Sequence, residues 1–218
     1  MADAWLLEQD FGLDRLRLAS RSLPSLGPRD VRLRMLACSL NYRDLLVVLG
    51  KYAPRQPLPL VPLSDGVGVV EEVGPAVTRV SVGDRVAPSF AQRWIDGPPS
   101  RAALLSTLGS PSDGVAATEV VLDEEGLVRV PGHLSDAEAA TLPCAALTAW
   151  SALFEHGAVA PGQTVLVQGT GGVSIFALQL AKLAGARVIA TSSSDAKLER
   201  VRELGAWRTI NYLSLIHI

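Results

Sequence analysis

The stretch from residue 164 to residue 191 constrains the fold of this chain more than any other segment. Residues 164–168 form a short run of apolar and β-branched side chains, and a glycine-rich turn follows at residues 169–172. Apolar side chains then recur at the i, i+3, i+4 and i+7 spacing of an amphipathic helix, up to a break at Gly185. Residues 187–191 form a second β-rich run. This order predicts a βαβ unit, in which the helical crossover makes the two strands parallel.

The glycine turn has the pattern of a dinucleotide-binding site. Its first glycine permits a tight turn, and its second lets backbone N–H groups approach a pyrophosphate, at which the helix N-terminus directs its partial positive charge. Ser174 replaces the third glycine of the pattern and is small enough for close helix–strand packing. A turn that serves only packing is the alternative interpretation. The residues expected to bind the cofactor here are Gly169, Thr170, Gly171, Gly172 and Val173.

The residues after the second strand indicate which nicotinamide nucleotide is bound. An NAD site usually has Asp or Glu about 20 residues beyond the first glycines, where the carboxylate binds the ribose 2′-hydroxyl. Ser192, Ser193 and Ser194 occupy that place here, and Lys197 lies three residues further on. Hydroxyl groups and an ammonium can bind a 2′-phosphate that a carboxylate would repel, so NADPH is predicted in preference to NADH. Alternatively, Ser194 or Asp195 caps the next helix, which is compatible with phosphate binding.

The first half of the chain has the pattern of a mostly antiparallel β domain. Short β-rich runs at residues 31–35, 66–73 and 85–88 are separated by glycine and proline turns. We therefore expect an α/β protein with two domains, a β domain at residues 1–125 and an incomplete doubly wound parallel sheet at residues 126–218.

Three further segments complete the expected architecture. Residues 118–122 and 127–130 flank a short acidic turn, which suits a hairpin. Residues 91–115 hold two clusters of Gly, Pro and Ser, so we expect a long surface excursion. Ser135, with Glu138 three residues on, is a capping-box signature for a helix.

Composition narrows the classes of function. The net charge of −2 provides no field that would hold nucleic acid or anionic lipid, so neither is expected as a partner. Asp3 and Glu8 interrupt the apolar start, unlike a secretory signal, so a cytoplasmic protein is expected. Cys38 and Cys144 are too few and too far apart for a disulfide framework or a cysteine-rich zinc lobe.

Several motifs succeed one another along nearly the whole chain. They are Asn41-Tyr42-Arg43-Asp44, Gly50-Lys51-Tyr52, the runs at residues 66–74 and 82–86, and Gly205-Ala206 with Ile210-Asn211-Tyr212. With the glycine turn they resemble the medium-chain dehydrogenase/reductase family, in particular its quinone-oxidoreductase-like and zinc-free alcohol-dehydrogenase-like branches. The resemblance implies a GroES-like β domain joined to a Rossmann domain, and an NADP-dependent oxidoreductase.

The resemblance also indicates where a catalytic zinc would be held. Zinc-dependent members use a cysteine, a histidine and a later cysteine or acid, and these positions fall on Asn41, Ser64 and Cys144. Catalytic zinc needs three protein ligands, so no metal is expected. Hydrogen-bond donors must then polarise the substrate oxygen, and Asn41, Tyr52 and Ser64 are the candidates. Alternatively, Asn41 and Asp44 cap a helix and Tyr52 forms a pocket wall.

On resemblance alone, Thr148 would contact the nicotinamide and Tyr212 would contact NADPH. The expected reaction is reduction of an activated C=C or C=O bond, in a quinone, enone or aldehyde, by NADPH. Zinc-free oxidation of an alcohol and an inactive nucleotide-binding protein are the alternatives. Dimers are common among similar proteins, which leaves a homodimer of the full-length protein open.

The end of the chain differs from the resemblance. A doubly wound sheet has about six strands, but only one more short run, residues 209–212, comes after the βαβ unit. Residues 213–218 are apolar and do not resemble the segment after Asn-Tyr in relatives, which suggests a truncated or out-of-frame end. We expect the 218-residue chain alone to bind NADPH poorly and to turn over little substrate, because strand edges and helix faces would be uncovered.

Overall fold

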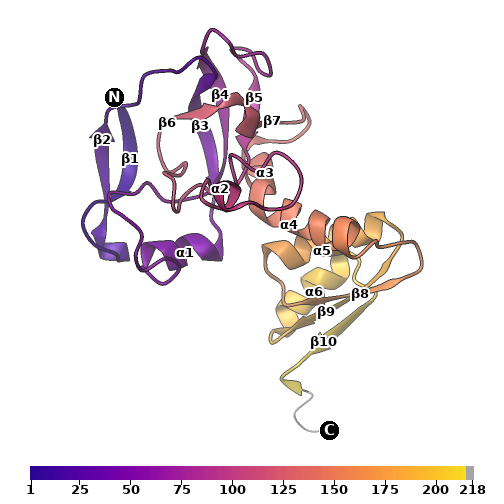
Figure 1. Cartoon of the computed structure of the whole chain (residues 1–218). Helices are drawn as coiled ribbons and strands as arrows, with labels where there is room; N and C mark the ends of the chain where they lie inside the picture. Colours follow the sequence, from indigo (N-terminus) through magenta and orange to yellow (C-terminus); the bar gives the residue numbers. More distant parts are fainter. Residues whose placement is uncertain (215–218) are drawn as a thin grey trace. The chain divides into compact units, whose positions relative to one another are not determined.

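A computed structural model describes residues 1–214, so residues 215–218 of the apolar end lie outside the described part. The chain forms two compact units, Met1–Cys144 and a second unit that begins at Ala145. Each unit has sheet structure of its own (Figure 1). The unit boundary therefore falls later in the chain than the domain boundary that we predicted after residue 125.

The first unit is built mainly from antiparallel strands. They are β1 (Ala2–Leu7), β2 (Leu16–Arg21), β3 (Asp30–Ser39), β4 (Asp65–Val73), β5 (Arg85–Pro88), β6 (Glu119–Asp123) and β7 (Leu127–Arg129). β1 pairs with β2, and the other five form one sheet in the order β6-β3-β4-β5-β7 (Figure 1). The predicted runs lie in β3, β4 and β5. The pairing of β1 with β2 was not predicted.

β6 and β7 do not form the predicted hairpin. β6 pairs with β3 and β7 pairs with β5, so they lie at opposite edges of the sheet, joined by the 3-10 turn η2 (Glu124–Gly126). So short a connection can join both edges only because the sheet curls until they approach each other. Glu124 stabilises the turn: its buried carboxylate accepts the backbone N–H groups of Thr78 and Arg79, each at 2.7 Å. The hairpin prediction was wrong because these partners are remote in sequence.

Short helices complete the first unit. They are η1 (Leu13–Arg15), α1 (Tyr42–Val48), α2 (Arg101–Leu104) and α3 (Asp136–Ala140). The predicted capping box is confirmed, because Ser135 and Glu138 hydrogen-bond reciprocally at the start of α3. Ala139 and Ala140 pack on Val67 of β4. This packing, with the pairing of β7 to β5, places residues 126–144 in the first unit.

The second unit contains the predicted βαβ arrangement. Its strands and helices are α4 (Leu147–Trp150), the π-helical η4 (Ser151–His156), β8 (Thr164–Gln168), α5 (Gly172–Leu183), β9 (Arg187–Ser192), α6 (Asp195–Glu203) and β10 (Arg208–Asn211). A π-helical turn, η3 (Leu142–Ala146), spans the boundary between the units. The strands are parallel and lie in the order β10-β9-β8, which confirms the parallel sheet.

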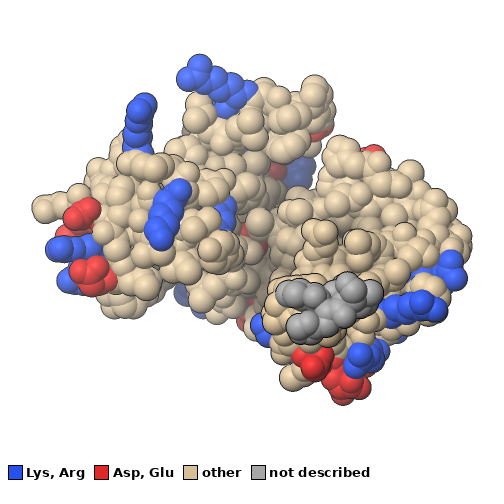
Figure 2. All heavy atoms as spheres, turned by 90° about the horizontal axis from the view of Figure 1, so that it is seen from below, with Lys and Arg blue, Asp and Glu red and all other residues tan. Residues whose placement is uncertain are grey.

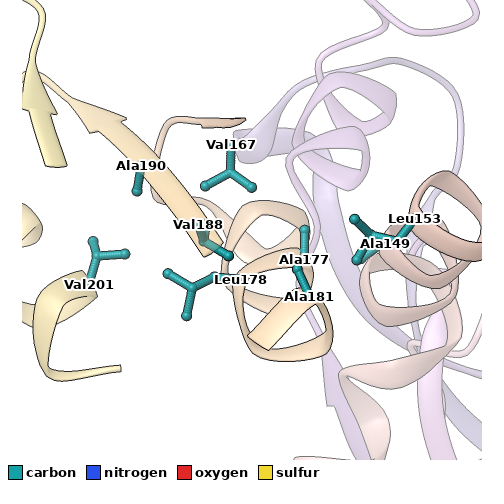
Figure 3. Packing of buried hydrophobic residues seen from close by; sticks show 9 residues of the cluster. All are labelled: Ala149, Leu153, Val167, Ala177, Leu178, Ala181, Val188, Ala190 and Val201. Atoms are coloured by element: carbon teal, nitrogen blue, oxygen red, sulfur yellow. The ribbon is translucent and has the colours of Figure 1, made fainter. Parts of the chain in front are cut away.

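The core of the second unit forms around α5. In Figure 3, Leu178 of α5 faces Val188 of the sheet, while Ala177 and Ala181 lie on the side of Ala149 and Leu153. Small side chains at these positions let helices and sheet approach closely and exclude water. The apolar periodicity in the sequence therefore corresponds to a helix that is covered on two sides.

The surface has little charge segregation on the face seen in Figure 2, where basic side chains stand singly or in small groups, some beside acidic ones. Among the helices formed by residues 1–214, none combines the length and the apolar character needed to cross a bilayer.

Candidate functional site

In the first unit, Asn41 begins α1, and the structure confirms the capping interpretation. The Asp44 carboxylate accepts the backbone N–H of Asn41 at 2.8 Å, which satisfies a donor that the helix itself leaves free. The amide Nδ2 of Asn41 and Oδ1 of Asp44 are buried and make no hydrogen bond of good geometry within residues 1–214, although the Asn41 amide lies near the carboxyl group of Asp65. A donor and an acceptor therefore remain available at this helix start.

Ser64 and Asp65 lie at the start of β4, and both are fully buried. The Ser64 hydroxyl donates to Oδ1 of Asp65 at 2.8 Å, and the backbone N–H of Cys144 donates to Oδ2 at 3.0 Å. A serine hydroxyl has one proton to donate. In this arrangement the proton of Ser64 is used to hold Asp65.

Two buried carboxyl groups dominate the electrostatics of this region. Burial raises the pKa of Asp44, although the backbone N–H of Asn41 and the charge of Arg43 oppose the rise. Burial also raises the pKa of Asp65, against the hydroxyl of Ser64 and the amide of Asn41. Cys38 is affected as well: the residue as a whole is exposed, but its thiol points inward to the carbonyl of Val115 at 3.2 Å, and desolvation there and the two nearby carboxyl groups raise its pKa to about 11. A thiol with so high a pKa is a poor nucleophile.

Tyr52 lies against Arg43, a residue that the sequence patterns did not single out as part of a site. The guanidinium carbon of Arg43 is 4.5 Å from the centre of the Tyr52 ring and 4.8 Å from that of Phe90. Arg43 also donates to the backbone carbonyls of Leu108 and Ser110, at 3.1 and 2.6 Å. Its place in the Asn-Tyr-Arg-Asp motif was the available signal. Arg43 fixes one face of the half-exposed Tyr52 ring.

The glycine turn of the second unit opens into free space. Gly169 has a φ of +84°, which disfavours residues with a side chain, and its N–H donates to Oγ1 of Thr191 at 3.2 Å. A Cβ added at Gly169 or Gly171 would meet no atom within 4 Å. No side chain caps α5, so the N–H groups of its first turn lack that partner. Ser174 donates to the carbonyl of Gln168 at 3.0 Å and so ties the helix to β8.

The predicted serines at the end of β9 differ in environment. Ser192 is buried and its hydroxyl accepts the N–H of Ser194 at 3.2 Å. Ser194 caps α6 by accepting the N–H of Lys197 at 3.4 Å, so the capping interpretation is confirmed. Ser193 and the side chain of Lys197 are exposed at the same edge of the sheet.

The remaining candidates also belong to the second unit. Tyr212 comes directly after β10, is about half exposed and donates its backbone N–H to Ser192 at 3.1 Å. Thr148 is exposed on α4. The structure thus groups Asn41 with Ser64 in the first unit. It groups the glycine turn with Ser193, Lys197 and Tyr212 at the carboxyl ends of the parallel strands.

Two further features of the first unit bear on the candidates. Hollows of about 690 and 400 Å³ are lined by other side chains and not by Asn41, Tyr52 or Ser64. Within the described residues 1–214, no group of three His, Cys, Asp or Glu side chains is placed to hold a metal ion.

The chain has a GroES-like antiparallel domain followed by a parallel α/β sheet of the Rossmann type. The comparisons with known proteins point to the same class of protein. Residues 27–132 match the alcohol dehydrogenase GroES-like domain, and residues 172–217 match the zinc-binding dehydrogenase family. The chain belongs to the medium-chain dehydrogenase/reductase family.

Individual relatives support this membership. A zinc-type alcohol dehydrogenase-like protein of Schizosaccharomyces pombe is 49% identical over 205 residues, which are 92% of this chain and 59% of the relative. A quinone oxidoreductase of Pseudomonas aeruginosa is 38% identical over 85% of this chain and 51% of its own length. The crystal structure of a putative alcohol dehydrogenase from Sinorhizobium meliloti 1021 superimposes with a TM-score of 0.89 at 47% identity, covering 98% of this chain and 63% of that one. The chain therefore spans about three fifths or less of these relatives.

Proposed function

We propose that the protein containing this chain is an NADPH-dependent oxidoreductase that transfers hydride, without zinc, to an activated C=C or C=O bond in a quinone, enone or aldehyde. The observation that carries the proposal is the glycine turn. Its open space at Gly169 and Gly171, next to the uncapped start of α5, fits a diphosphate held by backbone N–H groups. A nicotinamide nucleotide bound there would supply the hydride.

The preference for NADPH is supported by the exposed groups beyond β9. Ser193 and Lys197 offer a hydroxyl and an ammonium at the place where an NAD site has its acidic residue. Buried Ser192 would shape this turn through its bond to Ser194 and would not touch the phosphate. Tyr212, at the end of the neighbouring strand, would contact the same part of the nucleotide.

The donor set of the first unit does not fit a catalytic zinc. The three positions that correspond to the zinc ligands of relatives are Asn41, Ser64 and Cys144. They provide an amide, a hydroxyl and one thiol, and the proton of that hydroxyl is donated to Asp65. Zinc sites use thiolate, imidazole or carboxylate ligands, and a catalytic site needs three. We therefore propose zinc-independent chemistry.

Without zinc, charge that develops on the substrate oxygen must be stabilised by hydrogen bonds. Nδ2 of Asn41 is the best-suited donor, because it is buried and makes no hydrogen bond of good geometry within residues 1–214, although it lies close enough to Asp65 to lower the pKa of that carboxyl group. Tyr52 would be a second donor, held by Arg43. Ser64 would act through its bond to Asp65, as a positioning residue. Thr148 would contact the nicotinamide.

The test is NADPH oxidation by the full-length protein across quinones, enones and aldehydes, with metal analysis of the same preparation. We expect consumption of NADPH with at least one class and less than about 0.1 zinc per chain, since a functional site requires one metal for each active centre. Oxidation of alcohols alone, or stoichiometric zinc, would refute the proposal. Nucleotide binding without turnover of any class would favour the inactive binding protein. Cytoplasmic location and a homodimer stay predictions.

A further inference from the structure

An acidic residue lies just beyond the serines of the proposed 2′-phosphate site. Asp195 is the first residue of α6 and is exposed, two positions before Lys197. A carboxylate at the end of the second strand of such a sheet binds ribose hydroxyls and repels a 2′-phosphate. If the Asp195 side chain were free to move, its carboxylate would therefore favour NADH and would weaken the attraction of Lys197 for the 2′-phosphate.

Asn211 holds this carboxylate in one position. The amide Nδ2 of Asn211 donates to Oδ1 of Asp195 at 2.8 Å. On its other side, Oδ1 of the same amide accepts the backbone N–H of Leu213 at 3.1 Å. Because an amide oxygen accepts and an amide nitrogen donates, the two bonds fix the orientation of the Asn211 side chain. The donor is thereby kept aimed at Asp195.

The pair bridges the carboxyl ends of two neighbouring strands. Asn211 is the last residue of β10, and Asp195 lies just beyond the end of β9, with which β10 pairs through Asn211 and Ser192. Ligands of doubly wound sheets bind at these strand ends. The hydrogen bond therefore draws the carboxylate towards β10 and offsets part of its charge, while Ser193 and Lys197 stay exposed.

We infer that Asn211 is a specificity-determining residue, which restrains Asp195 so that the site accepts the 2′-phosphate of NADPH. The inference rests on the proposed function, since it concerns the same nucleotide site. The choice between NADPH and NADH would then depend on the pair Asn211 and Asp195, in addition to the serines that follow β9.

The test compares dissociation constants of NADPH and NADH for the full-length protein by titration calorimetry. Asn211→Leu keeps the size of the side chain and removes the donor. We expect it to lower the NADPH-to-NADH affinity ratio about five-fold, the size of an exposed charge interaction near 1 kcal/mol. Asp195→Asn removes the repelling charge and should raise the ratio by about the same factor.

A double variant separates specificity from structure. If Asn211 acts through Asp195, Asn211→Leu should not change the ratio in a chain that already carries Asp195→Asn. General damage to β10 would instead weaken both nucleotides equally in either background. Equal weakening, or an unchanged ratio in Asn211→Leu, would overturn the inference.

The outcome also separates this inference from the proposed function. A wild-type chain that prefers NADPH, with a ratio insensitive to Asn211→Leu, would leave the proposed cofactor standing and refute the role of Asn211. A wild-type chain that prefers NADH, with a ratio that still falls in Asn211→Leu, would support the role and refute the cofactor. A full-length protein that binds neither nucleotide would overturn both.

Discussion

The hydroxyl of Ser64 and the carboxylate of Asp65 form a fully buried hydrogen-bonded pair, 2.8 Å apart. The other oxygen of Asp65 receives the backbone N–H of Cys144, so the carboxylate ties β4 to the segment after α3. Because burying a carboxylate costs free energy, the ionisation of Asp65 affects the stability of the fold as well as the candidate site.

The first prediction concerns the pH dependence of stability. Burial raises the pKa of Asp65, so the folded chain binds this proton more tightly than the unfolded chain does. The resulting stabilisation is fully present below the unfolded pKa of about 4 and is lost as pH rises through the folded pKa. We therefore expect Asp65→Asn to lose less stability than wild type between pH 4 and pH 7, as measured by urea unfolding. Parallel pH profiles for the two proteins would contradict this.

The second prediction concerns Arg43. Lysine keeps the charge but cannot reproduce the two bonds to Leu108 and Ser110 while stacking on Tyr52 and Phe90. We expect Arg43→Lys to lower the free energy of unfolding by roughly 1–3 kcal/mol and to speed hydrogen exchange at residues 105–112. Arg55→Lys, at an exposed position, is the matched control. Equal exchange in both variants would show that Arg43 does not hold this loop.

The third prediction separates folding from nucleotide binding. A methyl group at Gly171 meets no atom of the chain within 4 Å, yet it enters the space proposed for the diphosphate. Gly171→Ala should weaken NADPH binding by about ten-fold or more, because the added methyl group would keep the backbone away from the diphosphate. We expect little change in thermal stability. Gly132→Ala, which also adds a methyl in open space but in the first unit, should change neither. Unaltered affinity in Gly171→Ala would place the nucleotide elsewhere.

The fourth prediction concerns the metal. Asn41→Cys combined with Ser64→His places a thiolate and an imidazole beside Cys144, which completes three ligands of the kinds that zinc prefers. We expect the double variant to retain about one zinc per chain after gel filtration, and wild type to retain almost none. Mass spectrometry of the eluted protein provides the count. A double variant without zinc would mean that the three positions do not converge.

Local patterns predicted the second unit well. The βαβ order, the parallel strands and the break at Gly185 follow from apolar periodicity and from the positions of glycine. Both are local features, which do not depend on residues far away in the sequence. The capping box at Ser135 and the capping role of Ser194 are confirmed for the same reason, since each bond joins residues three apart.

Relations between distant residues escaped prediction. The stacking of Arg43 on Phe90 joins residues far apart in the sequence, and the same holds for the bond from Cys144 to Asp65. The hairpin prediction for residues 118–130 rested on turn chemistry, but β6 pairs with β3 and β7 pairs with β5, which are partners from elsewhere in the sequence. Propensity is a weak guide where such packing competes with it.

The order of residues by itself determined the family, the parallel unit and the place of the glycine turn, because short-range spacing and backbone freedom suffice to specify them. Only the tertiary structure decided that Ser192 is buried while Ser193 stays exposed, that Ser64 donates its proton to Asp65, and that Asn211 donates to Asp195. Each of these features depends on which groups the folded backbone brings within hydrogen-bonding distance. Whether a side chain at a strand end is buried or exposed is decided only when the neighbouring strands pack.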